Sequence, residues 1–266
     1  MTKKALIILF VLTTLVSCGN YQQVLKSKDP ESKYNAAVEY FNQKEYNKAQ
    51  TLFDDVTSYY RGTERSEDIL HYLSRCYVGQ KVYSMAQEYY ETYIRSYPKG
   101  KYIIESRYMV GYCYYIDSPD PRLDQSTTNN AIKYLEEFLD MYPDSDYASD
   151  ARKYLDEMYD KLARKELYNA QLYYNLGTYL GNNYESARIV ASNALKKYPY
   201  SQYREDFNFI ILQARYQEAV LSIAERKAER VQETIDEYYN FITDFPDSKY
   251  RKSADKILAQ TKKMQK

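Results

Sequence analysis

The side chains able to do chemistry are few and lie far apart along this chain. The sequence contains one histidine, His71, and three cysteines, Cys18, Cys76 and Cys113. A zinc site needs several histidine or thiolate ligands at short spacing, and no His-Glu-x-x-His or Cys-x-x-Cys sequence supplies them. Nucleophilic catalysis needs a base and an oxyanion hole, and no Gly-x-Ser-x-Gly turn is present. The residue types therefore predict no catalytic residues, no metal and no cofactor other than a covalent lipid.

Charge and composition exclude further classes of function. The chain carries 37 basic and 37 acidic residues, so it has no basic excess for neutralising nucleic-acid phosphates. Acidic pairs such as Glu136 with Glu137 fall on outward helical positions and indicate solvated faces. A pair of carboxylates for glycoside cleavage stays open, and nothing in the sequence singles one out. Seven glycines leave little material for phosphate-binding loops. The 35 tyrosines suit helix packing and binding surfaces equally.

Cys18 is set apart by the sequence that precedes it. Two lysines are followed by an apolar run over residues 5–16, which is typical of a secretory signal and too short to span a membrane. The Leu-Val-Ser-Cys sequence ending at Cys18 resembles the bacterial lipobox, in which cleavage before the cysteine leaves a thiol that carries lipid. We therefore predict a signal peptide over 1–17 and a lipid anchor on Cys18. An ordinary signal peptide with a chance cysteine is the alternative.

The other two cysteines have two possible states. An exported protein can form disulfides, so Cys76 and Cys113 could pair. Both lie in helical patterns, however, and can equally be buried thiols.

An internal repeat organises the rest of the chain. In three places an alanine precedes a proline by twelve positions. Residues that can pack between two helices stand four and seven positions after each alanine. Positions i, i+4 and i+7 lie on one helical face, so a neighbouring helix can approach the alanine, and the proline ends the helix. The pairs are Ala86 with Pro98, Ala131 with Pro143 and Ala187 with Pro199, and the spacing continues at Ala49 with Arg61 and at Thr234 with Pro246.

The prolines open a second signature. Pro143, Pro199 and Pro246 each begin a Pro-x-Ser-x-Tyr sequence, and Pro98 begins a variant with glycine in place of serine. A serine at this place can accept a hydrogen bond from an early free N–H and so begin the next helix. The repeating unit is thus a helix, a turn, a second helix, a proline stop and a new cap.

This unit resembles the tetratricopeptide repeat. The resemblance is fullest in the second unit, which places Leu73, Ser74, Tyr77, Ala86, Tyr90, Tyr93 and Pro98 at the packing positions of the repeat. It implies an all-α chain that forms a right-handed superhelix of about five tetratricopeptide-like helix pairs. Because stacked repeats bury a core only with their neighbours, we expect one repeat domain. The expected parts are a lipidated linker over 18–30 and a domain over 31–260, with repeats near 31–62, 63–99, 100–144, 145–200 and 201–250 and a C-terminal capping helix.

One segment indicates which family of repeat proteins the chain resembles. Residues 162–179 read Leu-Ala-Arg-Lys-Glu-Leu-Tyr-Asn-Ala-Gln-Leu-Tyr-Tyr-Asn-Leu-Gly-Thr-Tyr, and Ala187, Arg188 and Pro199 follow. Together with the lipobox and the repeats, this succession resembles the BamD family of outer-membrane protein assembly lipoproteins. Two stretches depart from the family pattern, namely an insertion over residues 180–183 and a charged run over residues 224–230.

The resemblance implies a lipid-anchored protein on the periplasmic face of the cell outer membrane. There it would bind the barrel-forming central subunit of the β-barrel assembly machinery and receive nascent outer-membrane proteins. The first helices of the repeats would line a groove for an extended peptide. The candidate groove residues are Tyr34, Val38, Phe41, Asp68, His71, Arg75, Tyr108, Tyr112 and Tyr115. Aromatic faces with a few charges suit aromatic-rich peptides, although the same tyrosines can simply pack between helices.

Two alternatives share the anchor and the repeats. One is a tetratricopeptide lipoprotein of the cell envelope that organises peptidoglycan synthesis or division, which would lack the segment over residues 162–179. The other is a glycan-binding lipoprotein of a nutrient-uptake system, whose chains are typically much longer.

Overall fold

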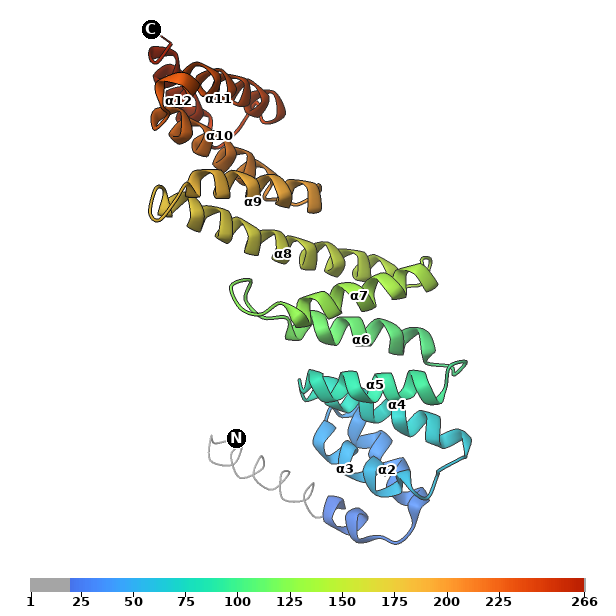
Figure 1. Ribbon diagram of the computed structural model, residues 1–266. Coiled ribbons are helices and arrows are strands. Elements are labelled where there is room, and N and C mark those ends of the chain that lie inside the picture. The colour runs from blue at the N-terminus through green and yellow to red at the C-terminus, as the bar shows by residue number, and fades with distance from the viewer. Residues whose placement is uncertain (1–19, 266) are drawn as a thin grey trace, which may run out of the picture. The chain divides into compact units, whose positions relative to one another are not determined.

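The computed structural model describes residues 20–265 as helices joined by turns, with no strand among them (Figure 1). The predicted signal peptide and Cys18 lie outside the described residues. The helices are α2 (Pro30–Asn42), α3 (Tyr46–Thr57), α4 (Glu64–Gly79), α5 (Tyr83–Ser96), α6 (Ile103–Asp117), α7 (Ser126–Met141), α8 (Ala148–Leu176), α9 (Asn183–Lys197), α10 (Arg204–Val220), α11 (Ala224–Asp244) and α12 (Arg251–Lys263).

Consecutive helices pack on one another inside two compact units. Unit 1 contains the described residues up to Ser118 together with Asn130–Arg152, and unit 2 contains Pro119–Asn129 together with the chain from Lys153 onward. In unit 1 each helix from α2 to α6 contacts the next, and in unit 2 the same holds from α9 to α12. The all-α class and the helix pairs expected from the sequence are confirmed.

Small residues mark the places where helices pack most closely. Ala49, Ala86, Ala131 and Ala187 have no exposed surface, and Thr234 is almost fully buried. The residues four and seven positions later are buried as well, as the spacing predicts. They are Phe53 and Val56, Tyr90 and Tyr93, Leu135 and Phe138, Ala191 and Ala194, and Tyr238 and Phe241.

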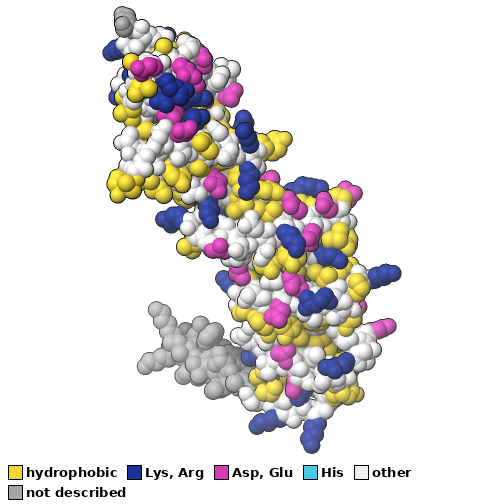
Figure 2. Space-filling model, in the orientation of Figure 1, with side chains coloured by type: hydrophobic (Ala, Val, Ile, Leu, Met, Phe, Trp, Pro, Cys, Tyr) yellow, Lys and Arg dark blue, Asp and Glu magenta, His cyan; other side chains and the backbone are white. Residues whose placement is uncertain are grey.

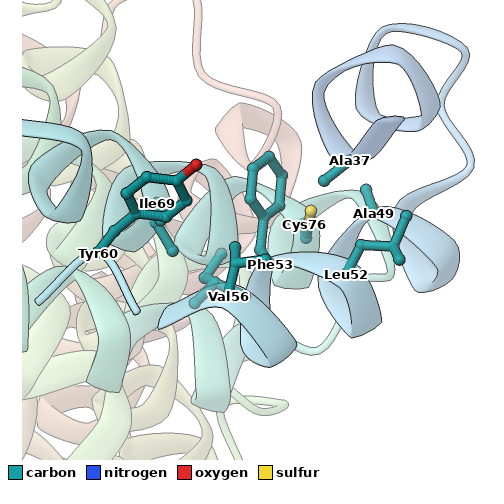
Figure 3. Close-up of a cluster of buried hydrophobic side chains, with 9 residues drawn as sticks. Ala37, Ala49, Leu52, Phe53, Val56, Tyr60, Ile69 and Cys76 are labelled. Carbon is teal, nitrogen blue, oxygen red and sulfur yellow. The ribbon is translucent and has the colours of Figure 1, made fainter. Parts of the chain in front are cut away.

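One cluster in unit 1 shows how this seam stabilises the fold. Figure 3 shows Phe53 and Val56 of α3 grouped with Ala37 of α2 and with Ile69 of α4. Burying one aromatic or aliphatic side chain of this size contributes roughly 1.5–3 kcal/mol. A repeated seam of such residues therefore accounts for the stacking of the pairs.

Both remaining cysteines belong to this packing. Cys76 and Cys113 are buried free thiols, so the structure shows no disulfide between them. Burial raises the pKa of each thiol to about 12, which keeps both protonated and unreactive at neutral pH.

The prolines end their helices as the sequence predicts. Helices α5, α7, α9 and α11 each end two residues before a proline, because the residue before proline disfavours the helical conformation. The predicted serine cap is present in two turns, where Ser201 Oγ accepts from the Tyr203 N–H at 3.2 Å and Ser248 Oγ accepts from the Tyr250 N–H at 2.9 Å. At Ser145 the prediction was wrong, because this hydroxyl is buried with no hydrogen-bond partner.

In two of the turns the tyrosine that closes the signature ties the turn to the first helix of the preceding pair. Tyr102 donates its hydroxyl to Asp68 at 2.9 Å, and Lys101 Nζ lies 2.5 Å from the same carboxylate. We call this arrangement of tyrosine, aspartate and lysine the turn clamp. The last turn repeats it with Tyr250, Asp206 and Lys249, at 2.5 Å for the hydroxyl and 2.7 Å for the ammonium.

Each clamp tyrosine also stacks on the first helix. The Tyr102 ring lies 3.7 Å from the His71 ring, and the Tyr250 ring lies 4.1 Å from the Phe209 ring, both nearly parallel. Tyr147 stacks on Tyr108 at 4.7 Å in the same way. The stack and the charged hydrogen bond together fix where each turn meets the helix pair.

A substitution at Gly111 tests the close approach of α6 and α7. A Cβ at Gly111 would lie 2.8 Å from Leu135 Cδ2 and 3.3 Å from the Leu135 backbone N, so α7 would have to move. We expect Gly111→Ala to lower the free energy of unfolding by about 1–3 kcal/mol, because overpacking outweighs the gain in helix propensity of up to ~1 kcal/mol.

Urea unfolding followed by circular dichroism measures the effect. The exposed helical substitution Ser84→Ala is the control and should change stability by less than about 0.5 kcal/mol. A Gly111→Ala protein as stable as the wild type would contradict this packing.

Candidate functional site

Three first helices of unit 1 meet at a set of aromatic and charged side chains. The Arg75 guanidinium of α4 lies 5.2 Å from the ring centroid of Phe41 on α2 and 3.9 Å from Glu105 on α6. Arg75 is exposed, whereas Phe41 and Glu105 are half-buried. We call this surface of α2, α4 and α6 the first-helix face. It offers a cation on an aromatic ring, which is a suitable contact for an extended polypeptide.

His71 lies beneath this face rather than on it. It is 2% exposed, it stacks on Tyr102, and its Nδ1 has no hydrogen-bond partner. Burial, reinforced by the charge of Arg75, lowers the pKa of His71 to about 3. The imidazole is therefore neutral in the folded protein, and its 3.6 Å approach to Glu105 is not an ion pair. Burial also raises the pKa of Glu105.

Asp68 stabilises the turn between α5 and α6. Its carboxylate accepts the Tyr102 hydroxyl and pairs with Lys101 in the turn clamp. Side-chain hydrogen bonding to Asp68 raises the pKa of Lys101. Asp68 therefore positions the turn, and its charge is already balanced within the chain.

The three tyrosines predicted on α6 form a ladder. Tyr112 lies between Tyr108 and Tyr115, with ring centroids 6.1 Å apart on either side. Tyr108 is buried against Phe138 and Tyr147, while Tyr112 and Tyr115 are half-buried. Two rings of the ladder, Tyr112 and Tyr115, are thus partly accessible, and the third, Tyr108, is buried.

The two remaining predicted residues on α2 serve packing. Tyr34 lies edge-on to Phe53 and Tyr60, with the Arg65 guanidinium 4.7 Å from its ring centroid. Val38 is half-buried against the core of the α2–α3 pair. Of the nine predicted residues, the structure brings Phe41 and Arg75 into contact and leaves Tyr112 and Tyr115 partly accessible, whereas Tyr108 is buried.

Sequence reasoning did not single out Glu105. This carboxylate joins His71 and Arg75 of α4 to the start of α6. It stands in the first turn of α6, three residues after Tyr102. Its place three residues after a clamp tyrosine was the signal that the sequence offered. The fold then shows that the Glu105 carboxylate faces the preceding helix pair.

The charges on the described surface are mixed. Figure 2 shows positive and negative side chains interspersed over the visible face, without a large area of one sign. Among residues 20–265 no group of three or more His, Cys, Asp or Glu side chains could hold a metal ion. No helix in that range is both long and apolar enough to cross a membrane.

The fold defines an all-α protein built from packed helix pairs. Residues 26–182, more than half of the chain, match the family model YfiO, described as outer membrane lipoprotein. The chain belongs to this family. Membership associates it with the outer membrane and with a non-catalytic class of scaffold.

One relative extends the comparison. The outer membrane protein assembly factor BamD of Caulobacter vibrioides is 28% identical over 145 residues, which cover 54% of this chain and 47% of that protein. The chain thus spans about half the length of this relative. The resemblance to the BamD family expected from residues 162–179 is confirmed.

Solved repeat proteins resemble the chain at the level of helices. The TPR2AB domain of yeast Sti1, solved in complex with an Hsp90 peptide, is 12% identical, with a TM-score of 0.42 over 88% of this chain and 98% of that chain. A thermophilic TPR protein from Thermus thermophilus is 14% identical, with a TM-score of 0.32 over 87% of this chain and 100% of that chain.

The depressed pKa of His71 predicts a pH-dependent stability. The unfolded imidazole has a pKa near 6.5 and the folded one near 3. The unfolded state therefore binds more protons between these values, and stability that is complete above about pH 6.5 is lost as the pH falls. His71→Phe keeps an aromatic stack, as Phe209 does under Tyr250, and removes this titration.

Urea unfolding of both proteins at pH 7, 6 and 5 measures the difference. We expect the wild type to lose stability relative to His71→Phe by up to about 1.4 kcal/mol for each pH unit below 6.5. Glu105 is present in both proteins, so its own titration largely cancels. Parallel losses in the two proteins would show that His71 is not held neutral.

Proposed function

We propose that this chain is a non-catalytic scaffold of the outer-membrane β-barrel assembly machinery, anchored by lipid on Cys18 at the periplasmic face. It binds the barrel-forming central subunit and nascent outer-membrane proteins. The observation that carries the proposal is the contact of Arg75 with Phe41 and Glu105 on the first-helix face, inside the residues matched by the family model. The half-buried rings of Tyr112 and Tyr115 on α6 lie within the same matched range.

The chemistry of this face suits an unfolded barrel strand. Such a strand is extended and carries apolar side chains at alternate positions, with aromatic side chains near its ends. The half-buried rings of Tyr112 and Tyr115 offer stacking surfaces, and Arg75 and Glu105 offer one charge of each sign. The face therefore favours aromatic-rich segments over charged ones.

A peptide-binding measurement tests the substrate part of the proposal. We expect Tyr112→Ala to weaken binding of an extended aromatic-rich peptide about tenfold, the equivalent of ~1.4 kcal/mol, because a stacking surface is lost. Tyr112→Phe keeps the ring and should bind nearly as well as the wild type. Isothermal titration calorimetry of the three proteins gives the affinities.

The exposed residue Tyr59, which is 66% exposed in the α3–α4 turn, supplies the matched control. Tyr59→Ala should leave peptide affinity unchanged. Equal weakening by Tyr59→Ala and Tyr112→Ala, or none by either, would contradict a site on the first-helix face.

The lipid anchor has its own test. Cys18→Ala removes the thiol that would carry the predicted lipid, and we expect the protein to move from the membrane fraction to the soluble periplasmic fraction. Fractionation and immunoblotting measure this, and mass spectrometry of the wild type should show the mass of the acyl chains. A Cys18→Ala protein that stays with the membrane would contradict the anchor.

A further inference from the structure

A cavity of about 440 Å³ lies in unit 2, between α8 and the α9–α10 turn. We call it the α8 pocket. Its volume is sufficient for one large side chain of a partner. Its lining combines carboxylates, tyrosine rings and one lysine, namely Asp156, Tyr159, Asp160, Lys197, Tyr198 and Tyr200.

Tyr200 is the unusual member of this lining. It is 97% exposed, although it contributes a large aromatic ring to the edge of the cavity. The residue after the proline is Lys99, Asp144 or Asp247 in the other turns. A single exposed ring is ordinary on a protein surface, so Tyr200 matters because its ring lies at the edge of a cavity that also contains carboxylates.

The turn clamp shows how a carboxylate and a tyrosine ring hold a cation in two other turns of the same chain. Lys101 Nζ lies against Asp68 and 5.0 Å from the ring centroid of Tyr102. Lys249 Nζ lies against Asp206 and 4.9 Å from the ring centroid of Tyr250. In both turns a carboxylate and a tyrosine ring hold a cation supplied by the chain itself.

The α9–α10 turn lacks that lysine. Gln202 occupies its place, since the Gln202 N–H donates to Asp160 at 3.1 Å as the Lys101 and Lys249 N–H groups donate to Glu67 and Glu205. The Gln202 amide also donates to Asp160 at 2.8 Å. Asp160 therefore matches Glu67 and Glu205, and Lys161 stands where the clamp has Asp68 or Asp206, so this turn has neither the aspartate nor the lysine of the clamp. The Asp160 carboxylate is hydrogen-bonded by Gln202 and receives no cation from that residue.

Asp156 adds a second carboxylate one helical turn before Asp160. It forms no hydrogen bond or ion pair with any residue of the described chain. Lys197 lies at the edge with its Nζ 5.3 Å from the ring centroid of Tyr198, so the lining carries two negative charges and one positive charge. Like charges at i and i+4 repel by a few tenths of a kcal/mol, and a bound cation would remove that repulsion.

We propose that the α8 pocket binds an arginine side chain of a partner polypeptide. The planar guanidinium can stack on the exposed Tyr200 ring while its N–H groups reach the Asp156 carboxylate. Tyr159 and Tyr198, with ring centroids 6.4 Å apart, form an apolar wall for the arginine methylenes. This pocket lies in unit 2 and does not rest on peptide binding at the first-helix face of unit 1.

Nuclear magnetic resonance of the full mature chain in detergent micelles tests the proposal. The probes are the blocked tripeptide acetyl-Gly-Arg-Gly-amide and its citrulline counterpart, which has nearly the same shape without the charge. We expect the arginine peptide to cause saturable shifts of the Tyr200 and Gln202 amides. The citrulline peptide should bind at least about tenfold more weakly.

Two variants locate the site. Tyr200→Ala and Asp156→Asn should each weaken arginine-peptide binding about tenfold and leave the rest of the spectrum in place, because neither side chain has a partner in the described fold. Tyr239→Ala removes another exposed tyrosine of unit 2, 47% exposed, and should change nothing. Equal shifts with the citrulline peptide or with potassium ions, no saturable shift, or unchanged binding by Tyr200→Ala would overturn the proposal.

Discussion

The stacking of a turn tyrosine on the preceding first helix is the contact on which the rest of the arrangement depends. Proline ends the second helix of a pair, but it does not fix the direction of the chain that follows. The turn clamp does so, because Tyr102 and Tyr250 each combine a ring stack with a hydrogen bond to an aspartate that is also paired with a lysine. The start of the following helix is placed relative to the helix before it in this way. The buried small residues of neighbouring helices can then pack closely.

This constraint also shapes the candidate sites. Where the clamp stacks on His71, it buries a neutral imidazole and leaves Arg75 and Glu105 as the charges near the surface of the first-helix face. In the α9–α10 turn Gln202 replaces the clamp lysine and Lys161 replaces the clamp aspartate, and the carboxylates of Asp156 and Asp160 line a cavity beside an exposed tyrosine. The same turn, varied at these two positions, thus forms a packed helix junction in some repeats and borders an open pocket in another.

Much of the fold was predictable because its signals are local. The spacing from Ala86 to Pro98 defines a helix face and a helix end, and the structure places both as expected. The family also follows from one continuous segment, residues 162–179. The site was less predictable, since Tyr34 and His71 fit a groove position by spacing yet are used for packing. Glu105 and the α8 pocket depend on contacts between residues more than 29 positions apart, which no single segment of sequence contains.

The central claim is that this chain works by holding the barrel-forming subunit of the assembly machinery at the outer membrane. Affinity purification of the intact lipoprotein from native membranes, followed by mass spectrometry of the proteins that remain bound, tests it most directly. Under the proposed function the barrel-forming central subunit is recovered in stoichiometric amount from the wild-type protein. Recovery of only peptidoglycan-synthesis or division proteins, or of only a glycan transporter, would contradict the claim.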